Sequence, residues 1–173
     1  MTGKVLWHVT MSLDGFIADA DDGLAWGAGH TTKLADEAAA TMGAGLSGRR
    51  TYDVNRGAKA YGVWSGPDFV LTHEPPAEPD PGVTFLTGDL AAAVDTARAA
   101  AGEKNVVLFG ANLGQHCVTE GLVDEILVHL VPVLLGDGVR LFHNPGGKPC
   151  KLERIELGES GQLTDLRFRP VRN

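Results

Sequence analysis

Residues 106–142 constrain the fold of this chain more than any other segment. An apolar run ends at Phe109, directly before Gly110, and the stretch that begins at Asn112 has the composition of a helix. A second apolar run, residues 126–135, ends in Gly-Asp-Gly. Strand, glycine turn, helix and strand form a βαβ unit, and α/β sheets bind ligands beyond the carboxyl ends of such strands. The segment therefore predicts an α/β fold with a site for a phosphate-bearing cofactor.

Length and composition fit one globular domain, residues 1–173, that buries about two-thirds of its unfolded surface. The formal net charge of −7 argues against nucleic acid or an anionic membrane as the main partner. The apolar runs are too short to span a bilayer, and the first residues lack a secretion signal. Cys117 and Cys150 share no motif spacing and are expected to be reduced. We expect a cytoplasmic protein.

The rest of the chain alternates between the two kinds of element. Strands are expected at residues 4–11, 46–48, 68–72, 83–86 and 163–170. Helices are expected at residues 31–42, 49–54 and 90–101, with Thr31 or Thr32 capping the first and Asp89 the last. Pro132 interrupts the apolar run 126–135 and indicates an edge position or a bulge. This order predicts a mainly parallel sheet with an antiparallel last strand.

Two glycine-containing motifs compete as the first phosphate site. Residues 43–48 spell G-x-G-x-x-G, but a dinucleotide-binding turn needs a strand before it, and here a helix is expected there. The better candidate is Gly48-Arg49-Arg50-Thr51, where a strand ends and a helix begins. A phosphate group can accept hydrogen bonds from the free N–H groups of a first helical turn, from arginine side chains and from a hydroxyl. A solvated arginine pair beside an ordinary helix is the alternative.

A second candidate is Gly110-Ala111-Asn112, at the end of the strand 106–109. Glycine permits close approach of a ligand to the backbone, and Asn112 with Gln115 forms a potential capping pair. A capped helix without a ligand is the alternative here. Two helix starts at one sheet edge, one of them rich in arginine, suit a dinucleotide with an additional phosphate. This arrangement favours NADPH over NADH.

Several motifs together resemble a known family. The hexapeptide GRRTYD (residues 48–53) resembles an element of the dihydrofolate reductase-like superfamily. With SLDGFIA (12–18), the FGA turn, GLVDEI (121–126) and PVLLGDGVRLF (132–142), it is similar to the reductase domain of bacterial riboflavin biosynthesis, and especially to short stand-alone relatives of that domain. The resemblance implies a three-layer α/β fold with a mixed, mostly parallel sheet of about eight strands and flanking helices. It also implies NADPH across the strand ends.

The resemblance assigns roles to particular positions. It places the phosphates of NADPH near Gly48, Arg49, Arg50, Thr51, Thr72 and His73, and the pyrophosphate and nicotinamide near Gly110, Ala111, Asn112 and Leu113. Ser12, Asp14 and Gly15 would begin the loop that closes over the nicotinamide and the substrate. Trp26, in the loop 19–29, either stacks on a flat ring or anchors the loop.

The chain departs from the family at three points. Ala111 replaces the second glycine of a pair that carries a cis peptide in dihydrofolate reductases, so this turn is expected to be trans or shifted. Phe16 stands where riboflavin reductases commonly have a lysine that would meet a ribityl or phosphoribosyl group. No deaminase domain is expected before the reductase domain, because the chain begins at the first strand of the latter. These departures bear on the substrate rather than on NADPH.

Hydride transfer also needs a proton source. The helix that by resemblance borders the substrate carries Asp36 and Glu37, either of which is a candidate donor if burial raises its pKa, or else a solvated helix acid. Asp14 is a third candidate, although Asp-Gly after a strand is often a plain turn. His8 and His129 are interpreted as residues at the edge of the core, and no histidines have metal-ligand spacing.

These observations lead to two functional hypotheses. The first is an NADPH-dependent oxidoreductase that reduces a small heterocyclic, imine or carbonyl substrate, with a riboflavin-pathway aminouracil or a dihydrofolate-like pterin as examples. The second is a nucleotide- or pterin-binding homodimer without turnover. A homodimer is expected in either case, because relatives often pair through their late strands and the apolar residues 126–135 need cover.

Overall fold

Strands and helices alternate in the computed structural model, which describes residues 3–29, 32–55 and 64–171. The strands are β1 (Val5–Ser12), β2 (Phe16–Ala18), β3 (Met42–Gly48), β4 (Asp68–Leu71), β5 (Thr84–Leu86), β6 (Asn105–Phe109), β7 (Glu125–Val131), β8 (Val139–Arg140), β9 (Leu152–Ser160) and β10 (Leu163–Pro170). The helices are α1 (Lys33–Thr41), α2 (Arg49–Asn55), α3 (Leu90–Ala101) and α4 (Ala111–Thr119), with a short 3-10 helix at Ala25–Gly27. No helix in these described ranges is long and apolar enough to cross a membrane.

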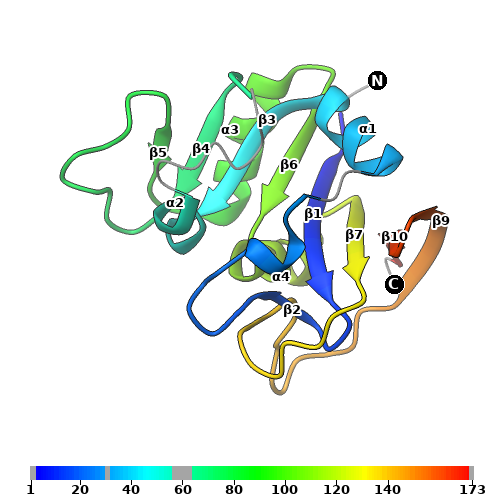
Figure 1. Cartoon of the computed structure of the whole chain (residues 1–173). Coiled ribbons are helices and arrows are strands. Elements are labelled where there is room, and N and C mark those ends of the chain that lie inside the picture. Colours follow the sequence, from blue (N-terminus) through cyan, green and yellow to red (C-terminus); the bar gives the residue numbers. More distant parts are fainter. Residues whose placement is uncertain (1–2, 30–31, 56–63, 172–173) are drawn as a thin grey trace.

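Eight of the strands form one sheet in the order β5-β4-β3-β6-β1-β7-β10-β9. The strands from β5 to β7 are parallel, and β10 then pairs antiparallel with both β7 and β9. Strands β2 and β8 form a separate two-stranded ribbon. The predicted mixed, mostly parallel sheet is confirmed. In Figure 1 the parallel strands point toward the edge of the sheet where α2, α4 and β2 lie.

Helices cover both faces of the sheet and create three layers. On one face, Leu34 and Ala38 of α1 pack with Leu6, Val107 and Leu127 of the central strands. On the other face, the apolar sides of α3 and α4 pack against β1, β3 and β6. The alternation of side chains along each strand separates these two cores.

The helix caps agree with the sequence. The Thr32 hydroxyl accepts a hydrogen bond from the amide of Ala35 at 3.1 Å, so Thr32 rather than Thr31 caps α1. Asp89 caps α3 through the amides of Ala91 and Ala92, as predicted. These caps satisfy N–H groups that have no partner within the helix.

Some elements of the structure differ from the prediction. The third strand begins at Met42 rather than at residue 46, so the whole G-x-G-x-x-G sequence lies in β3 and forms no dinucleotide-binding turn. Strand β7 ends at Val131, and it pairs on both sides, so Pro132 marks neither an edge strand nor a bulge. Proline lacks the N–H that would continue the strand. Strand β9, at the edge of the sheet, was not predicted.

Candidate functional site

A cavity of about 700 Å³ lies at the edge of the sheet where β3 and β6 end. Its volume falls in the range of small-molecule sites. The wall is formed by β1, the segment 17–28, α2, the turn before α4, and β8. The polar or aromatic residues in the wall include His8, Thr10, Asp22, Trp26, Arg50, Thr51, Asn55, Asn112, Gln115 and Arg140. Two segments predicted to bind phosphate therefore contribute to one cavity, the first through residues 50–51 and the second through residues 110–112.

The turn at Gly110 is fixed in place by the first strand. The indole nitrogen of Trp7 donates a hydrogen bond to the carbonyl oxygen of Gly110 at 3.0 Å. Gly110 has a φ of 88° and a ψ of 158°, a conformation that is essentially restricted to glycine. A Cβ atom at this position would collide with the hydroxyl of Thr51. The two segments approach each other closely because Gly110 has no side chain.

The bond between Gly110 and Ala111 is trans, because the described residues contain no cis peptide. This outcome agrees with the trans or shifted turn expected from the alanine. Ala111 and Asn112 line the cavity, whereas the side chain of Leu113 packs into the core beneath α4. Leu113 therefore contributes through its position in the helix and not through its side chain.

The two arginines of α2 face different surroundings. The guanidinium of Arg50 forms an ion pair with Asp22, with Nη2 to Oδ1 at 2.6 Å and Nε to Oδ1 at 3.0 Å. This contact links α2 to the segment 17–28 across the cavity, and the Arg50 side chain is 68% exposed. A cation at the wall of an open cavity is available to an anionic ligand.

Arg49 lies outside this cavity and close to the end of β4. Its Nε atom is 3.0 Å from both carboxylate oxygens of Asp53, and its Nη1 donates to the carbonyl oxygen of Glu74 at 2.6 Å. The same carbonyl accepts a hydrogen bond from the Thr72 hydroxyl at 3.1 Å. The structure thus brings Arg49 and Thr72 together, with His73 exposed between Thr72 and Glu74.

Ser12, Asp14 and Gly15 form a turn that does not line the cavity. The Ser12 hydroxyl donates to Asp14, which also accepts the amides of Leu135 and Gly136. These hydrogen bonds, led by the one from Ser12, lower the pKa of Asp14 to about 2. A carboxyl group with this pKa is ionised at neutral pH, so the structure does not support Asp14 as a proton donor.

The next residues along the chain do reach the cavity. Ile17, Ala18, Leu24 and Trp26 give part of the wall an apolar, partly aromatic surface. The Trp26 indole also donates to the carbonyl oxygen of Gly23 at 3.1 Å. Trp26 therefore anchors its loop, which is one of the two predicted roles, and it also contributes to the wall.

Arg140 is a site residue that the sequence analysis missed. It pairs with Phe16 between β8 and β2, and its guanidinium carbon lies 4.6 Å from the centre of the Phe16 ring. Arg140 also lines the cavity. A positive charge is therefore present beside the position where riboflavin reductases commonly have lysine. The signal was available in the sequence, because Arg140 belongs to the motif at residues 132–142.

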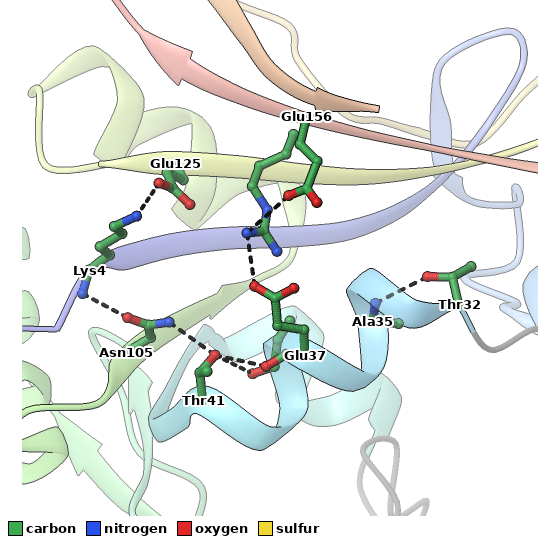
Figure 2. A network of polar contacts seen from close by, with 10 residues as sticks. Lys4, Thr32, Ala35, Glu37, Thr41, Asn105, Glu125 and Glu156 are labelled. Carbon is green, nitrogen blue, oxygen red and sulfur yellow. Dashed lines mark hydrogen bonds and ion pairs between the residues drawn. The ribbon is translucent and has the colours of Figure 1, made fainter. Parts of the chain in front are cut away.

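Asp36 and Glu37, the main candidates for the proton donor, are exposed on α1 and do not line the cavity. Glu37 accepts a hydrogen bond from Nη1 of Arg167 at 3.1 Å, and Glu156 lies 3.4 Å from the same nitrogen (Figure 2). The helix turns both carboxylates away from the ligand space. Asp36 and Glu37 are therefore surface residues, and neither is placed to donate a proton to a ligand in the cavity.

A buried polar chain that the sequence analysis also missed reaches the cavity wall. His129 and Asp165 are buried in adjacent strands, with His129 Nδ1 and Asp165 Oδ1 2.6 Å apart. His129 Nε2 is in turn 2.6 Å from Nε2 of His8, a residue that lines the cavity. The interpretation of His8 and His129 as residues at the edge of the core did not include this contact between them. Within the described ranges, no group of three or more His, Cys, Asp or Glu side chains is arranged to hold a metal ion.

With this geometry established, comparison with known proteins identifies the family. The model of the RibD C-terminal domain matches residues 3–164. The chain belongs to this family. Its relatives include YwjB, an uncharacterized protein of Bacillus subtilis (strain 168), which is 27% identical over 172 residues that cover 97% of this chain and 98% of YwjB.

Solved structures show the same fold. A protein from Shewanella sp. PV-4 that is assigned by name to riboflavin biosynthesis has a TM-score of 0.83 and 24% identity, with 98% of this chain and 99% of that chain covered. Dihydrofolate reductase from Enterococcus faecalis, complexed with NADP(H), has a TM-score of 0.68 and 15% identity, with 98% of each chain covered. The resemblance inferred from the motifs and the dihydrofolate reductase-like α/β fold are both confirmed.

Proposed function

We propose that this protein is a cytoplasmic NADPH-dependent reductase that acts on a C=N or C=O bond of a small heterocycle. The main support is one observation: residues 50–51 and 110–112, predicted independently as phosphate-binding segments, line a single cavity with Trp26 in its wall. The family and the fold support the same reaction class. When bound, the reduced nicotinamide would supply the hydride.

The residues present fit such a cofactor. The turn at Gly110 has no side chain, so the Thr51 hydroxyl lies directly beside its backbone, where a Cβ atom would collide with it. Arg50 and Thr51 offer charged and neutral donors at this wall, and Asn112 adds an amide. We assign the pyrophosphate to Arg50, Thr51 and the Gly110 turn. We assign the additional phosphate of NADPH to Arg49, which lies beside Thr72 and His73.

For the substrate, we propose a flat heterocycle with an anionic substituent. Trp26 and the apolar residues of the segment 17–28 suit a flat ring, while Arg140 provides a second positive charge in the wall. The aminouracil of riboflavin biosynthesis, with its phosphoribosyl group, has this chemistry. Replacement of Arg140 by Ala should then raise KM for such a substrate more than replacement by Lys.

A fluorescence titration with NADPH, and with NADH as the comparison, tests the cofactor assignment. Loss of one charge-assisted phosphate contact is worth about 1.5–3 kcal/mol, or about 10- to 100-fold in Kd. Arg49→Ala should therefore weaken binding of NADPH much more than binding of NADH. Lys104→Ala, which removes an exposed cation in the turn between α3 and β6, is the control and should change neither. Absence of binding of either nucleotide below millimolar concentration would refute the proposal.

Turnover distinguishes a reductase from a binding protein. Oxidation of NADPH is followed at 340 nm with dihydrofolate, the aminouracil ribosyl intermediate and simple imines as probes. A protein that binds NADPH and reduces none of these substrates would support the alternative function, nucleotide or pterin binding without catalysis.

We also propose a homodimer that covers β9. This strand lies at the edge of the sheet, and Leu152, Ile155 and Leu157 on it are exposed. Unpaired edge strands with apolar side chains are sites of association. Light scattering should give twice the mass of one chain, and Leu157→Glu should shift the protein toward the monomer. A wild-type protein with the mass of one chain would disprove this assembly.

A further inference from the structure

We propose that Asp165, His129 and His8 form a proton relay that ends at the cavity, and that His8 delivers the proton required by the reduction. The inference rests on the proposed reductase function and identifies the proton source for that site. It replaces the acids of α1, which the structure places outside the cavity.

The relay is built by the register of three neighbouring strands. His129 of β7 is directly opposite Asp165 of β10. His8 of β1 is paired with Leu127, which lies two residues before His129 on β7. Residues two apart on a strand share a face, so all three side chains lie on the face of the sheet that α1 covers. The distances between Asp165 Oδ1 and His129 Nδ1, and between the two Nε2 atoms, are both 2.6 Å.

Burial makes this chain of groups difficult to explain by packing alone. Asp165 is 2% exposed and His129 is 5% exposed. Apolar residues of similar size often replace such buried polar groups at little cost in stability, so packing alone does not require them. Only His8, which is partly buried, gives the chain a route to a ligand, because it lines the cavity.

The hydrogen bonds determine where the protons are. An ionised Asp165 accepts from His129, so His129 carries a proton on Nδ1. Two imidazole nitrogens in contact require one proton between them. If this proton is on His129, then His129 is an imidazolium and His8 carries its own proton on Nδ1. If it is on His8, then both rings are neutral and Nδ1 of His8 is unprotonated.

The electrostatic surroundings disfavour a positive charge on His8. Burial, followed by the proximity of His129, lowers the pKa of His8 to about 3. Arg167 also disfavours a positive His8, whereas Asp165 favours it more weakly than burial opposes it. Arg167 itself is paired with Glu37 of α1 and Glu156 of β9. His129, in direct contact with Asp165, is the position where a positive charge has a carboxylate partner.

Transfer of one proton from His8 to the substrate can then be written as a balanced step. The substrate carbon gains the hydride, and the adjacent nitrogen or oxygen takes the proton from Nδ1 of His8. As that bond breaks, Nε2 of His8 accepts the proton from Nε2 of His129, which becomes neutral while its Nδ1 proton stays on the bond to Asp165. Solvent returns one proton to the cluster after product leaves. His8 is the catalytic residue in this step, and His129 and Asp165 are positioning residues.

Nitrogen-15 NMR of the wild-type protein tests the relay without any substrate. Over one pH step, His129 should lose its Nε2 proton while the tautomer of His8 changes from Nδ1–H to Nε2–H. Asp165→Asn should lower the midpoint of this step, because an imidazolium at His129 would lose its carboxylate partner. A His8 tautomer that stays constant while His129 titrates, or a midpoint unchanged by Asp165→Asn, would overturn the relay.

Kinetics with a probe substrate provide the second test. His8→Gln should lower kcat by about 100-fold or more and leave the Kd for NADPH unchanged, because a general acid contributes about that much. Asp165→Asn should shift the pH profile of kcat, which a merely structural role would not do. The exposed His116→Gln is the matched control. Unchanged kcat in His8→Gln refutes the inference, whereas failure of the wild type to bind NADPH refutes the proposed function and leaves the NMR test to decide the relay.

Discussion

Replacement of Gly110 by Ala tests whether the close approach of two chain segments builds the cavity wall. The backbone of Gly110 has a positive φ of 88°. The added methyl group would also collide with the hydroxyl of Thr51, the nearest atom to an ideal Cβ. The substitution therefore has two separable physical effects, backbone strain and steric overlap.

The structure allows the size of each effect to be worked out. An alanine in this glycine-only region of φ and ψ costs about 1–3 kcal/mol. Overpacking at a site of close contact costs about 1–3 kcal/mol more. The free energy of unfolding should therefore fall by about 2–6 kcal/mol in Gly110→Ala. In a Thr51→Ala background the hydroxyl is gone and the Thr51 Cβ lies at 3.4 Å, so only the strain remains.

The assay is urea unfolding followed by circular dichroism, applied as a double-mutant cycle. Gly48→Ala is the control, because nothing lies within 4 Å of a Cβ there and its φ is not positive. We expect Gly48→Ala to change stability by less than about 0.5 kcal/mol. If Gly110→Ala has the same effect with and without Thr51→Ala, to within about 0.5 kcal/mol, then no steric coupling exists and the argument for the cavity wall fails.

Three further predictions concern stability and reactivity. Leu127→Ala, at a fully buried position, should lower the free energy of unfolding by about 2–5 kcal/mol. Leu134→Ala, at a position 70% exposed, should have almost no effect, and similar losses in both would contradict the core assignment. Burial raises the pKa of the Cys117 thiol to about 12, so an aromatic disulfide reagent should modify only Cys150 in the folded protein, and rapid modification of two thiols would be inconsistent with this. The pKa of Asp14 falls from 3.8 to about 2 on folding, so its contribution to stability is present above pH 3.8 and disappears as the pH falls through 2. Acid unfolding of Asp14→Asn should lack this component, and an unchanged profile would contradict it.

The sequence was most informative where one face of an element is buried. Helix α3 was predicted with its cap because an apolar stripe follows Asp89, and α1 because residues of high helix propensity follow a capping threonine. Strand β9 was missed because most of its residues are exposed, so only the short alternation at residues 154–157 marks it. The first half of β3 was missed because Gly43 and Gly45 have no side chains to show a periodicity.

The sequence predicted the site residues that belong to local motifs. It did not predict the side-chain contacts between strands that are far apart in the sequence. Gly110, Arg50 and Trp26 belong to recognisable local patterns, and the structure places all three in the cavity wall. The contact between His8 and His129 depends on the register of two strands far apart in the sequence, which no local pattern encodes. One signal was nonetheless present, because a histidine interrupts each of two otherwise apolar strands.

The ion pair between Arg50 and Asp22 affects how ligand affinities must be interpreted. An anion that binds Arg50 competes with a carboxylate that already holds Nε and Nη2, so its measured Kd includes the energy of weakening the contact with Asp22. Added salt weakens the internal contact and screens the incoming anion at the same time. These two effects oppose each other, so the affinity for a phosphate group should depend less on ionic strength than it would for an arginine without an acidic neighbour.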